Sequence, residues 1–158
     1  MKAILEPDFR WHRCDIKSIS LLGNIMTNEA AMNANTNEAA LVRDGVISEG
    51  SHTNIFFVKD GTVLTHPANE HILNGITRKI VLKLCSDLDI PVNEKPIAEN
   101  EIEHMDEAFF TGTTTQVASI AQLGSRTFYK NDEIGKVTLK LQKAFAQLRE
   151  INTANITL

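Results

Sequence analysis

The order of apolar and polar positions predicts both strands and helices. Strand character is clear in "EAALVRDGVIS", where "RDG" marks a tight turn, and in "TNIFFVKDGTVLT", where two β-rich runs around "KDG" indicate a hairpin. The segment "FRWHRCDIK" also reads as extended. "EAFFTGTTTQVASI" is typical of a buried strand that enters a threonine-rich turn, and a further strand is expected around "RTFYK".

Three segments carry helical patterns. "GNIMTNEAAMNAN" has moderate helix propensity. After Gly75, apolar residues recur at helical spacing until Asp89 and Pro91 end the pattern, which predicts a helix packed on a sheet. Those residues are Ile76, Ile80, Val81, Leu84 and Leu88. A last helix has one apolar face, made of Val137, Leu141, Ala144, Phe145 and Leu148.

Strands and helices are mixed along the chain, and no Pro-, Gly- or Ser-rich linker divides it. A chain of 158 residues has the size of one ordinary domain that buries its own core. We therefore predict a single domain over residues 1–158, of the α/β (α+β) class, with a mixed β-sheet and packed helices.

Composition and charge exclude several classes of function. The formal net charge is -4, and Lys and Arg do not cluster, which argues against nucleic acid as the main partner. No apolar run approaches membrane-spanning length. The two cysteines form no CxxC motif, and the five histidines show no metal-ligand spacing. We expect a soluble cytoplasmic protein with reduced thiols, no membrane contact and no metal site.

Lys17 is the first candidate for chemistry. It follows Ile16 and precedes the apolar pair Leu21 and Leu22, at what reads as the end of a buried strand. Burial favours the neutral form of an amine, and a neutral amine is a nucleophile that forms a Schiff base with a carbonyl. Taken alone, such a lysine more often extends to the surface from a strand end.

Glu49 and the segment "LNGITR" add a second and a third feature. The predicted helix start at Gly75, Ile76 and Thr77 offers free backbone N–H groups and the positive end of the helix dipole, which suit a phosphate. An ordinary turn with an N-cap is the alternative for these residues. Together with the carboxylate of Glu49, the series favours a site rather than an isolated turn.

In order and spacing, these residues resemble the class IV aminotransferases, the fold-type IV family of pyridoxal-phosphate enzymes. The family pattern begins with Glu, a small residue, Asn, an apolar and an aromatic residue, continues with apolar-x-Thr, and ends with apolar-x-Gly-apolar-x-basic. The matching residues are Glu49, Ser51, Asn54, Ile55, Phe56, Val63, Thr65, Leu73, Gly75, Ile76 and Arg78.

The resemblance implies pyridoxal 5'-phosphate as the cofactor and gives each residue a role. Lys17 matches the lysine that holds the cofactor as a Schiff base and moves the substrate proton, and it is the expected catalytic residue. Glu49 matches the carboxylate that pairs with the pyridine nitrogen. The other expected cofactor-binding residues are Leu73 against the ring, and Ile76, Thr77 and Thr113 at the phosphate.

Within the family, "RCDIKSISLLGN" looks most like the D-amino-acid transaminases. Branched-chain aminotransferases place a tyrosine where this chain has Leu22. The implied reaction transfers an amino group between a D-amino acid and a 2-oxo acid. Aminodeoxychorismate lyases share the cofactor residues, so they and the branched-chain enzymes remain alternatives.

The resemblance covers essentially the whole chain but only the C-terminal domain of a family member, a mixed sheet or pseudo-barrel with packed helices. A complete enzyme has a preceding lobe that binds the substrate carboxylate, and this N-terminal lobe lies outside the chain. Apolar surface that would meet it favours a homo-oligomer. The alternative is a truncated, inactive domain that binds the cofactor or self-associates. Arg10 is expected to brace a loop or assist the phosphate, and His52 to crowd the cofactor pocket.

Overall fold

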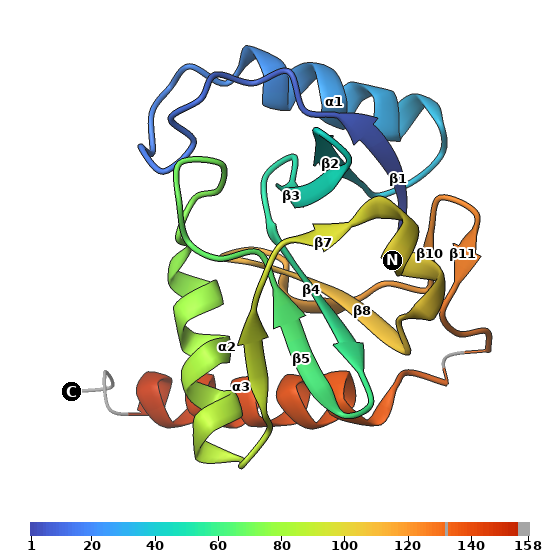
Figure 1. Cartoon of the computed structure of the whole chain (residues 1–158). Helices are drawn as coiled ribbons and strands as arrows, with labels where there is room; N and C mark the ends of the chain where they lie inside the picture. Colours follow the sequence, from blue (N-terminus) through green and yellow to red (C-terminus); the bar gives the residue numbers. More distant parts are fainter. Residues whose placement is uncertain (132, 155–158) are drawn as a thin grey trace.

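The computed structural model describes residues 1–131 and 133–154, and it consists of two β-sheets with helices packed around them (Figure 1). The end of the predicted domain, at residue 158, lies outside the described residues. The α-helices of this part are α1 (Leu22–Asn33), α2 (Ile76–Asp87) and α3 (Lys136–Ala154), with a 3-10 helix η1 (Glu99–His104). The predicted α/β class with mixed sheets is confirmed.

The first sheet has the strand order β11-β10-β1-β2-β3-β7, and the second has the order β6-β5-β4-β8-β9. Parallel pairs join β1 to β2 and to β10, and β5 to β6, so each sheet is mixed. The strands of the first sheet are β1 (Lys2–Pro7), β2 (Glu38–Arg43), β3 (Val46–Gly50), β7 (Ile97–Ala98), β10 (Gln122–Leu123) and β11 (Arg126–Thr127). Those of the second are β4 (Asn54–Lys59), β5 (Thr62–Thr65), β6 (Val92–Glu94), β8 (Glu107–Gly112) and β9 (Gln116–Ser119).

Asp-Gly dipeptides close the two hairpins that the sequence predicts, β2–β3 and β4–β5. Asp44 and Gly45 have φ values of 52° and 76°, and Asp60 and Gly61 have 49° and 75°. Both residues of each turn are thus left-handed, as a turn whose twist matches that of the flanking strands requires. Only Gly reaches this region without strain, and Asp tolerates it.

Alternate residues of β4 and β8 pack into two different cores. Phe57 and Phe110 belong to the core shared by the two sheets, whereas Phe56 and Phe109 face α2 and α3, with their rings stacked 5.0 Å apart. Successive side chains of a strand point to opposite faces, so a strand covered on both faces needs a continuous apolar run. This explains the unbroken hydrophobic segments of β4 and β8.

The strand predicted for "FRWHRCDIK" is wrong. β1 ends at Pro7, and residues 8–21 form a loop that leads to α1 (Figure 1). Local hydrogen bonds bend this segment: Arg10 N donates to Asp8 Oδ1 at 3.2 Å, and Ile16 N donates to Arg13 O at 3.1 Å. An aspartate that binds the backbone two residues on favours a turn over a strand. Lys17 therefore lies exposed on a loop and not at a buried strand end.

The predicted helices are confirmed. Val81, Leu84 and Cys85 of α2 and Leu141 of α3 are buried against the second sheet. In "RTFYK" only Arg126–Thr127 forms a strand. Among the described residues, no helix combines the length and the apolar character needed to cross a membrane.

Candidate active site

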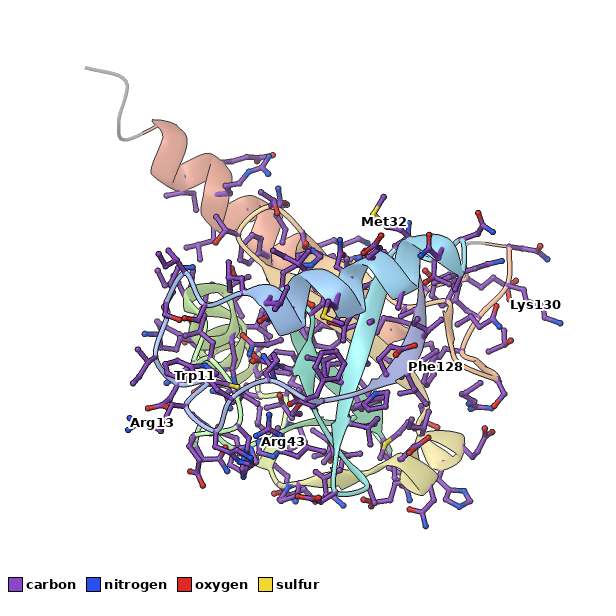
Figure 2. All side chains as sticks on the ribbon, turned by 90° about the horizontal axis from the view of Figure 1, so that it is seen from above. Trp11, Arg13, Met32, Arg43, Phe128 and Lys130 are labelled. Atoms are coloured by element: carbon purple, nitrogen blue, oxygen red, sulfur yellow. The ribbon has the colours of Figure 1, made fainter. Side chains whose placement is uncertain are left out.

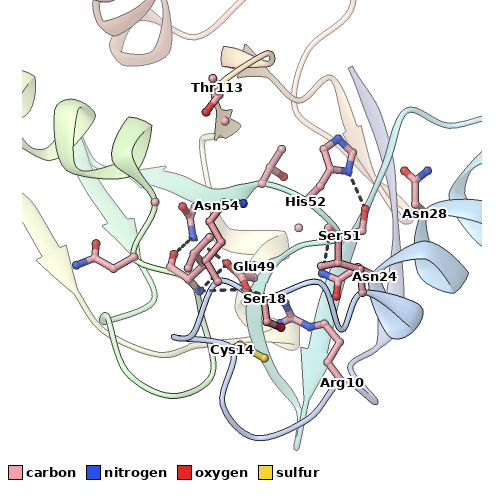
Figure 3. A pocket seen from close by; sticks show the side chains of 18 of the residues that line it. Arg10, Cys14, Ser18, Asn24, Asn28, Glu49, Ser51, His52, Asn54 and Thr113 are labelled. Atoms are coloured by element: carbon pink, nitrogen blue, oxygen red, sulfur yellow. Dashed lines mark hydrogen bonds and ion pairs between the residues drawn. The ribbon is translucent and has the colours of Figure 1, made fainter.

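A cavity of about 510 Å³ opens between the loop 8–21, the start of α1, the β3–β4 connection and the start of α2 (Figure 3). All the expected site residues line it, although they come from distant parts of the chain: Lys17, Glu49, Leu73, Ile76, Thr77 and Thr113. The structure therefore brings together an amine, a carboxylate, a helix N-terminus and a hydroxyl around one space.

Glu49 is the second-to-last residue of β3 and is nearly inaccessible to solvent. Its carboxylate accepts hydrogen bonds from Arg10 Nη1 at 2.7 Å, from Asn54 Nδ2 at 2.9 Å and from Leu73 N at 3.1 Å. Burial raises the pKa of Glu49 to about 7, and the charge and hydrogen bond of Arg10 oppose this rise. The result is an oriented carboxylate that changes charge near neutral pH.

Arg10 forms salt bridges with Asp8 and Glu49, whereas the sequence left its role open between bracing a loop and assisting a phosphate. Its Nε donates to Asp8 Oδ1 at 2.9 Å, and its Nη1 reaches Glu49. The arginine is therefore an electrostatic partner of the site carboxylate. Asp8, two residues before Arg10, is the signal from which this pair could have been predicted, but the family motif does not include it.

Asn54 connects Glu49 to the opposite wall. Its Nδ2 also donates to Leu73 O at 2.8 Å, so one side chain holds the carboxylate and the loop before α2 at a fixed separation. A Cβ atom on Gly75 would lie only 2.4 Å from Asn54 Oδ1. Because Asn54 is held by these hydrogen bonds, position 75 has room only for glycine.

The start of α2 presents backbone N–H groups to the cavity. Gly75 is the N-cap, and no described side chain caps this end of the helix. The N–H groups of the first turn, including Ile76 and Thr77, have no acceptor within the helix, and the dipole adds positive potential. Arg78 is buried behind them, where it donates to His66 O at 2.9 Å and pairs with Glu94. This arrangement suits an anionic group such as a phosphate.

A pair of threonine hydroxyls completes the wall next to α2. Thr113 lies in the connection from β8 to β9 and lines the cavity (Figure 3). Thr111 lines it too, and its Oγ1 is buried without a hydrogen-bond partner among the described residues. A buried polar atom normally has a partner, so this hydroxyl fits a site that receives a polar ligand.

His52 lines the cavity that the expected cofactor residues share. Its Nδ1 lies 3.2 Å from Glu38 Oε2 and 3.0 Å from Ser51 Oγ, and its side chain is half exposed (Figure 3). Cys14 lines the cavity as well, and burial raises the pKa of its thiol. In residues 1–131 and 133–154, no group of three His, Cys, Asp or Glu side chains is arranged to hold a metal ion.

The comparisons with known proteins agree with this geometry. Residues 4–123 match the family model described as amino-transferase class IV. A D-alanine aminotransferase of Bacillus licheniformis is 41% identical over 127 residues, which are 80% of this chain and 45% of that protein. The chain thus spans about half the length of the curated relatives it matches.

Solved structures extend the agreement to the fold. The branched-chain aminotransferase of Thermoproteus uzoniensis, with norvaline, superposes with a TM-score of 0.83 at 31% identity, covering 93% of this chain and 50% of that one. A branched-chain amino acid aminotransferase of T.th., complexed with N-(5'-phosphopyridoxyl)-L-glutamate, gives a TM-score of 0.81 at 25% identity over 92% of this chain and 51% of that one. The expected fold-type IV architecture is therefore confirmed.

Proposed function

Because the chain belongs to the class IV aminotransferases, we propose that the complete protein transfers amino groups between an amino acid and a 2-oxo acid with the help of pyridoxal 5'-phosphate. One observation carries the proposal. A single cavity gathers an accessible lysine, a buried carboxylate and an uncapped helix start, which are the groups that would bind this cofactor's aldehyde, ring nitrogen and phosphate. The hydroxyl of Thr111, which lacks a partner in the described part, also fits a polar ligand.

Lys17 and Glu49 would have different roles in this reaction. Lys17 Nζ is the group that would hold the cofactor covalently and later carry a proton to and from the substrate α-carbon. Glu49 would keep a proton on the ring nitrogen, since a neighbouring negative charge favours the protonated base. When bound, the cofactor supplies an electron sink for the charge that develops on the substrate.

The remaining site residues would fix the position of the cofactor in the cavity. We assign the phosphate to the N–H groups of Ile76 and Thr77 and to the hydroxyl of Thr113, and one ring face to the side chain of Leu73. These roles follow from the family motif, and their common position in the cavity supports them. Residues 1–158 would then act as one cofactor-binding unit.

For the substrate we propose a D-amino acid, because the sequence relatives at up to 41% identity are named D-alanine aminotransferases. Leu22, where branched-chain enzymes have tyrosine, supports the same choice. A second candidate is a domain that binds the cofactor without turnover, and the assay below separates it from the first. We further propose self-association through the large apolar side chains exposed on α1, and a cytoplasmic location, which two unpaired thiols support.

Covalent trapping tests the cofactor site. The chain is mixed with pyridoxal phosphate and reduced with borohydride, and the modified peptide is identified by mass spectrometry. We expect modification at Lys17, its loss in Lys17→Ala, and no change in Lys143→Ala, which removes an exposed lysine of α3. Equal labelling of several lysines, with no loss in Lys17→Ala, would contradict the proposal.

An amino-transfer assay separates the candidate functions. D-alanine and L-leucine are compared as donors to 2-oxoglutarate, with this chain and with a longer one that carries a preceding lobe. Turnover of D-alanine supports the proposed substrate, and turnover of L-leucine alone replaces it with the branched-chain alternative. Trapping at Lys17 without turnover in either chain favours the inactive binding domain.

A further inference from the structure

Four charged side chains form a continuous buried series that ends at the candidate active site. Arg43 Nη2 lies 3.0 Å from Asp8 Oδ1, Asp8 binds Arg10 through both carboxylate oxygens, and Arg10 Nη1 lies 2.7 Å from Glu49 Oε1. Arg43 comes from the end of β2, and it makes no contact with Glu49 in the structure's described residues. Arg43 and the site carboxylate are therefore linked indirectly, with Asp8 and Arg10 as the charged groups between them.

Every member of this series is withdrawn from water. The side chain of Asp8 is inaccessible, and those of Arg10, Glu49 and Arg43 expose 8% of their surface or less. Two arginines and two carboxylates have cancelling formal charges. A buried charge without a counter-charge is strongly unfavourable, so the balance of the whole series decides which of its members stay ionised.

Asp8 needs Arg43 because Arg10 serves two carboxylates. Burial on its own would raise the pKa of Asp8, but hydrogen bonds and charges of Arg10 and Arg43 outweigh it and hold the pKa at about 2. Asp8 is thus the firmly ionised carboxylate, while the pKa of Glu49 lies at about 7. If positive charge is lost from the series, we expect Glu49 rather than Asp8 to take up a proton, because the pKa of Glu49 is higher.

Arg43 also holds the loop that carries Lys17. Its Nη2 donates to Arg10 O at 3.0 Å and is 3.4 Å from Trp11 O, and Figure 2 shows Arg43 on the side of the molecule where Trp11 and Arg13 lie. Its Nε is buried and finds no acceptor in the part of the chain that the structure describes. An unpaired buried donor lowers the stability of the folded state, which indicates that the positive charge of Arg43 is kept at this position despite that cost.

We propose that Arg43 is a positioning residue of the candidate active site, which acts through Asp8 and Arg10 to keep the Glu49 carboxylate ionised and oriented. Its importance for the reaction rests on the proposed function, in which Glu49 serves the cofactor ring. Without Arg43, one arginine would face two carboxylates in a buried setting. The excess negative charge would be relieved when Glu49 takes up a proton, and a neutral carboxyl would no longer favour a protonated ring nitrogen.

Among the described residues, the other groups around the series are neutral donors, two histidines and the thiol of Cys14, which interacts electrostatically with all four charged members and whose pKa is raised by burial. Glu49 faces the charged groups Arg10 and Asp8 and the neutral donors Asn54 and Leu73. Arg43 Nη1 lies 3.1 Å from His12 Nδ1 and 3.5 Å from His71 Nδ1. A guanidinium only donates, so these two ring nitrogens act as acceptors beside it. Both histidines stay in place in every variant that the test compares.

The test is a carboxyl ¹³C NMR titration of Glu49 in the chain without cofactor, with the signal assigned by its absence in Glu49→Gln. In Arg43→Gln we expect the Glu49 midpoint to rise by about one pH unit. In Arg43→Lys the charge is kept, and we expect less than half of that rise. Arg13→Gln, which removes an exposed arginine of the same loop, should leave the midpoint unchanged.

A double variant keeps the test decisive if Arg43→Gln does not fold. Asp8→Asn combined with Arg43→Gln removes one buried charge of each sign and leaves Arg10 paired with Glu49 alone. We expect its Glu49 midpoint to lie close to that of the wild type or below it. A midpoint that stays raised in the double variant, or an equal rise in Arg43→Gln and Arg43→Lys, would overturn the proposal.

The two levels of inference can fail separately. If Lys17 does not take up the cofactor but the Glu49 midpoint responds as expected, the proposed function fails and the electrostatic role of Arg43 stands. If the cofactor binds at Lys17 but the Glu49 midpoint ignores Arg43, the inference on Arg43 fails. In an active protein, Arg43→Gln should also move the pH profile of amino transfer in the direction of the Glu49 midpoint.

Discussion

The loop over residues 8–21 contains two aspartate–arginine pairs with the same chemistry and almost the same geometry. Arg10 binds Asp8 through Nε at 2.9 Å and Nη2 at 3.0 Å, and Arg13 binds Asp15 through the same two nitrogens at 2.9 Å each. Each pair joins residues two positions apart. Accessibility separates them, since the side chains of the first pair expose 6% and 0%, and those of the second 58% and 38%.

The difference shows that burial and neighbouring charges, and not pairing as such, decide whether an ion pair affects the candidate active site. Water screens the exposed pair, in which Arg13 and Asp15 bind each other and Glu70 is a further charge near Arg13. The buried pair continues to Glu49 on one side and Arg43 on the other, so that its charges affect the candidate active site. Both arginines have a raised pKa, but only the buried pair couples to a group that titrates near neutral pH.

The largest effect should come from removing the buried arginine. Arg10→Met leaves Asp8 and Glu49 close together without the cation between them, and breaking a buried pair costs about 3–5 kcal/mol. Urea unfolding followed by circular dichroism measures the loss. Arg13→Met is the matched control, and its urea midpoint should equal that of the wild type. Equal losses in both variants would remove the distinction between the two pairs.

The second effect is a fall in stability as pH rises. Because burial raises the pKa of Glu49 from 4.5 in the unfolded chain to about 7, the folded state binds the proton more tightly. Its contribution is complete below pH 4.5 and is lost as pH rises towards 7, which amounts to about 3 kcal/mol. Urea unfolding between about pH 4 and 8 measures it, and the fall should be absent in Glu49→Gln.

Asp8 gives an effect of the opposite sign at lower pH. Its pKa is lowered from 3.8 to about 2, so its contribution is present above about pH 4 and is lost as pH falls through 2, by about 2 kcal/mol. Acid titration of stability should show this loss in the wild type and in Asp15→Asn. A loss that persists in Asp8→Asn would assign it to another carboxylate.

The smallest effect concerns the neutral neighbour of the buried pair. Ser48 Oγ lies 3.0 Å from Asp8 Oδ2 and 3.2 Å from Leu41 O, and a hydroxyl donates to one acceptor at a time. Ser48→Ala should lower the unfolding free energy by about 1 kcal/mol. The Glu49 midpoint should stay in place, since no charge is removed; a shift comparable to that of Arg43→Gln would show that packing, and not charge, controls Glu49.

Much of the fold was predictable because it depends on local chemistry. The Asp-Gly turns at Asp44 and Asp60, the apolar face of α2 and the continuous apolar run of β4 all express short-range preferences. β1 was not predicted, because its partners Glu38 and Gln122 lie far along the chain. The error at "FRWHRCDIK" has a different, local origin. A β-rich composition does not reveal that Asp8 binds the Arg10 backbone and bends the chain.

The candidate site too has a part that was predictable from the sequence and a part that was not. Motif spacing found the residues Lys17, Glu49 and Thr77, and they line one cavity. The spacing was silent on Asp8 and Arg43, whose influence on Glu49 depends on which charges the fold places side by side and removes from water.

Residue types and their spacing alone specified the turns, the helices and the family to which the chain belongs. Tertiary structure decided which of two similar aspartate–arginine pairs is buried, and hence which carboxylate titrates near neutral pH. The physical reason is that turn and helix preferences belong to short stretches of chain. The interaction energy and the pKa of a charged group depend instead on the surrounding dielectric and on neighbouring groups. Those neighbours come from segments that only the folded chain brings together.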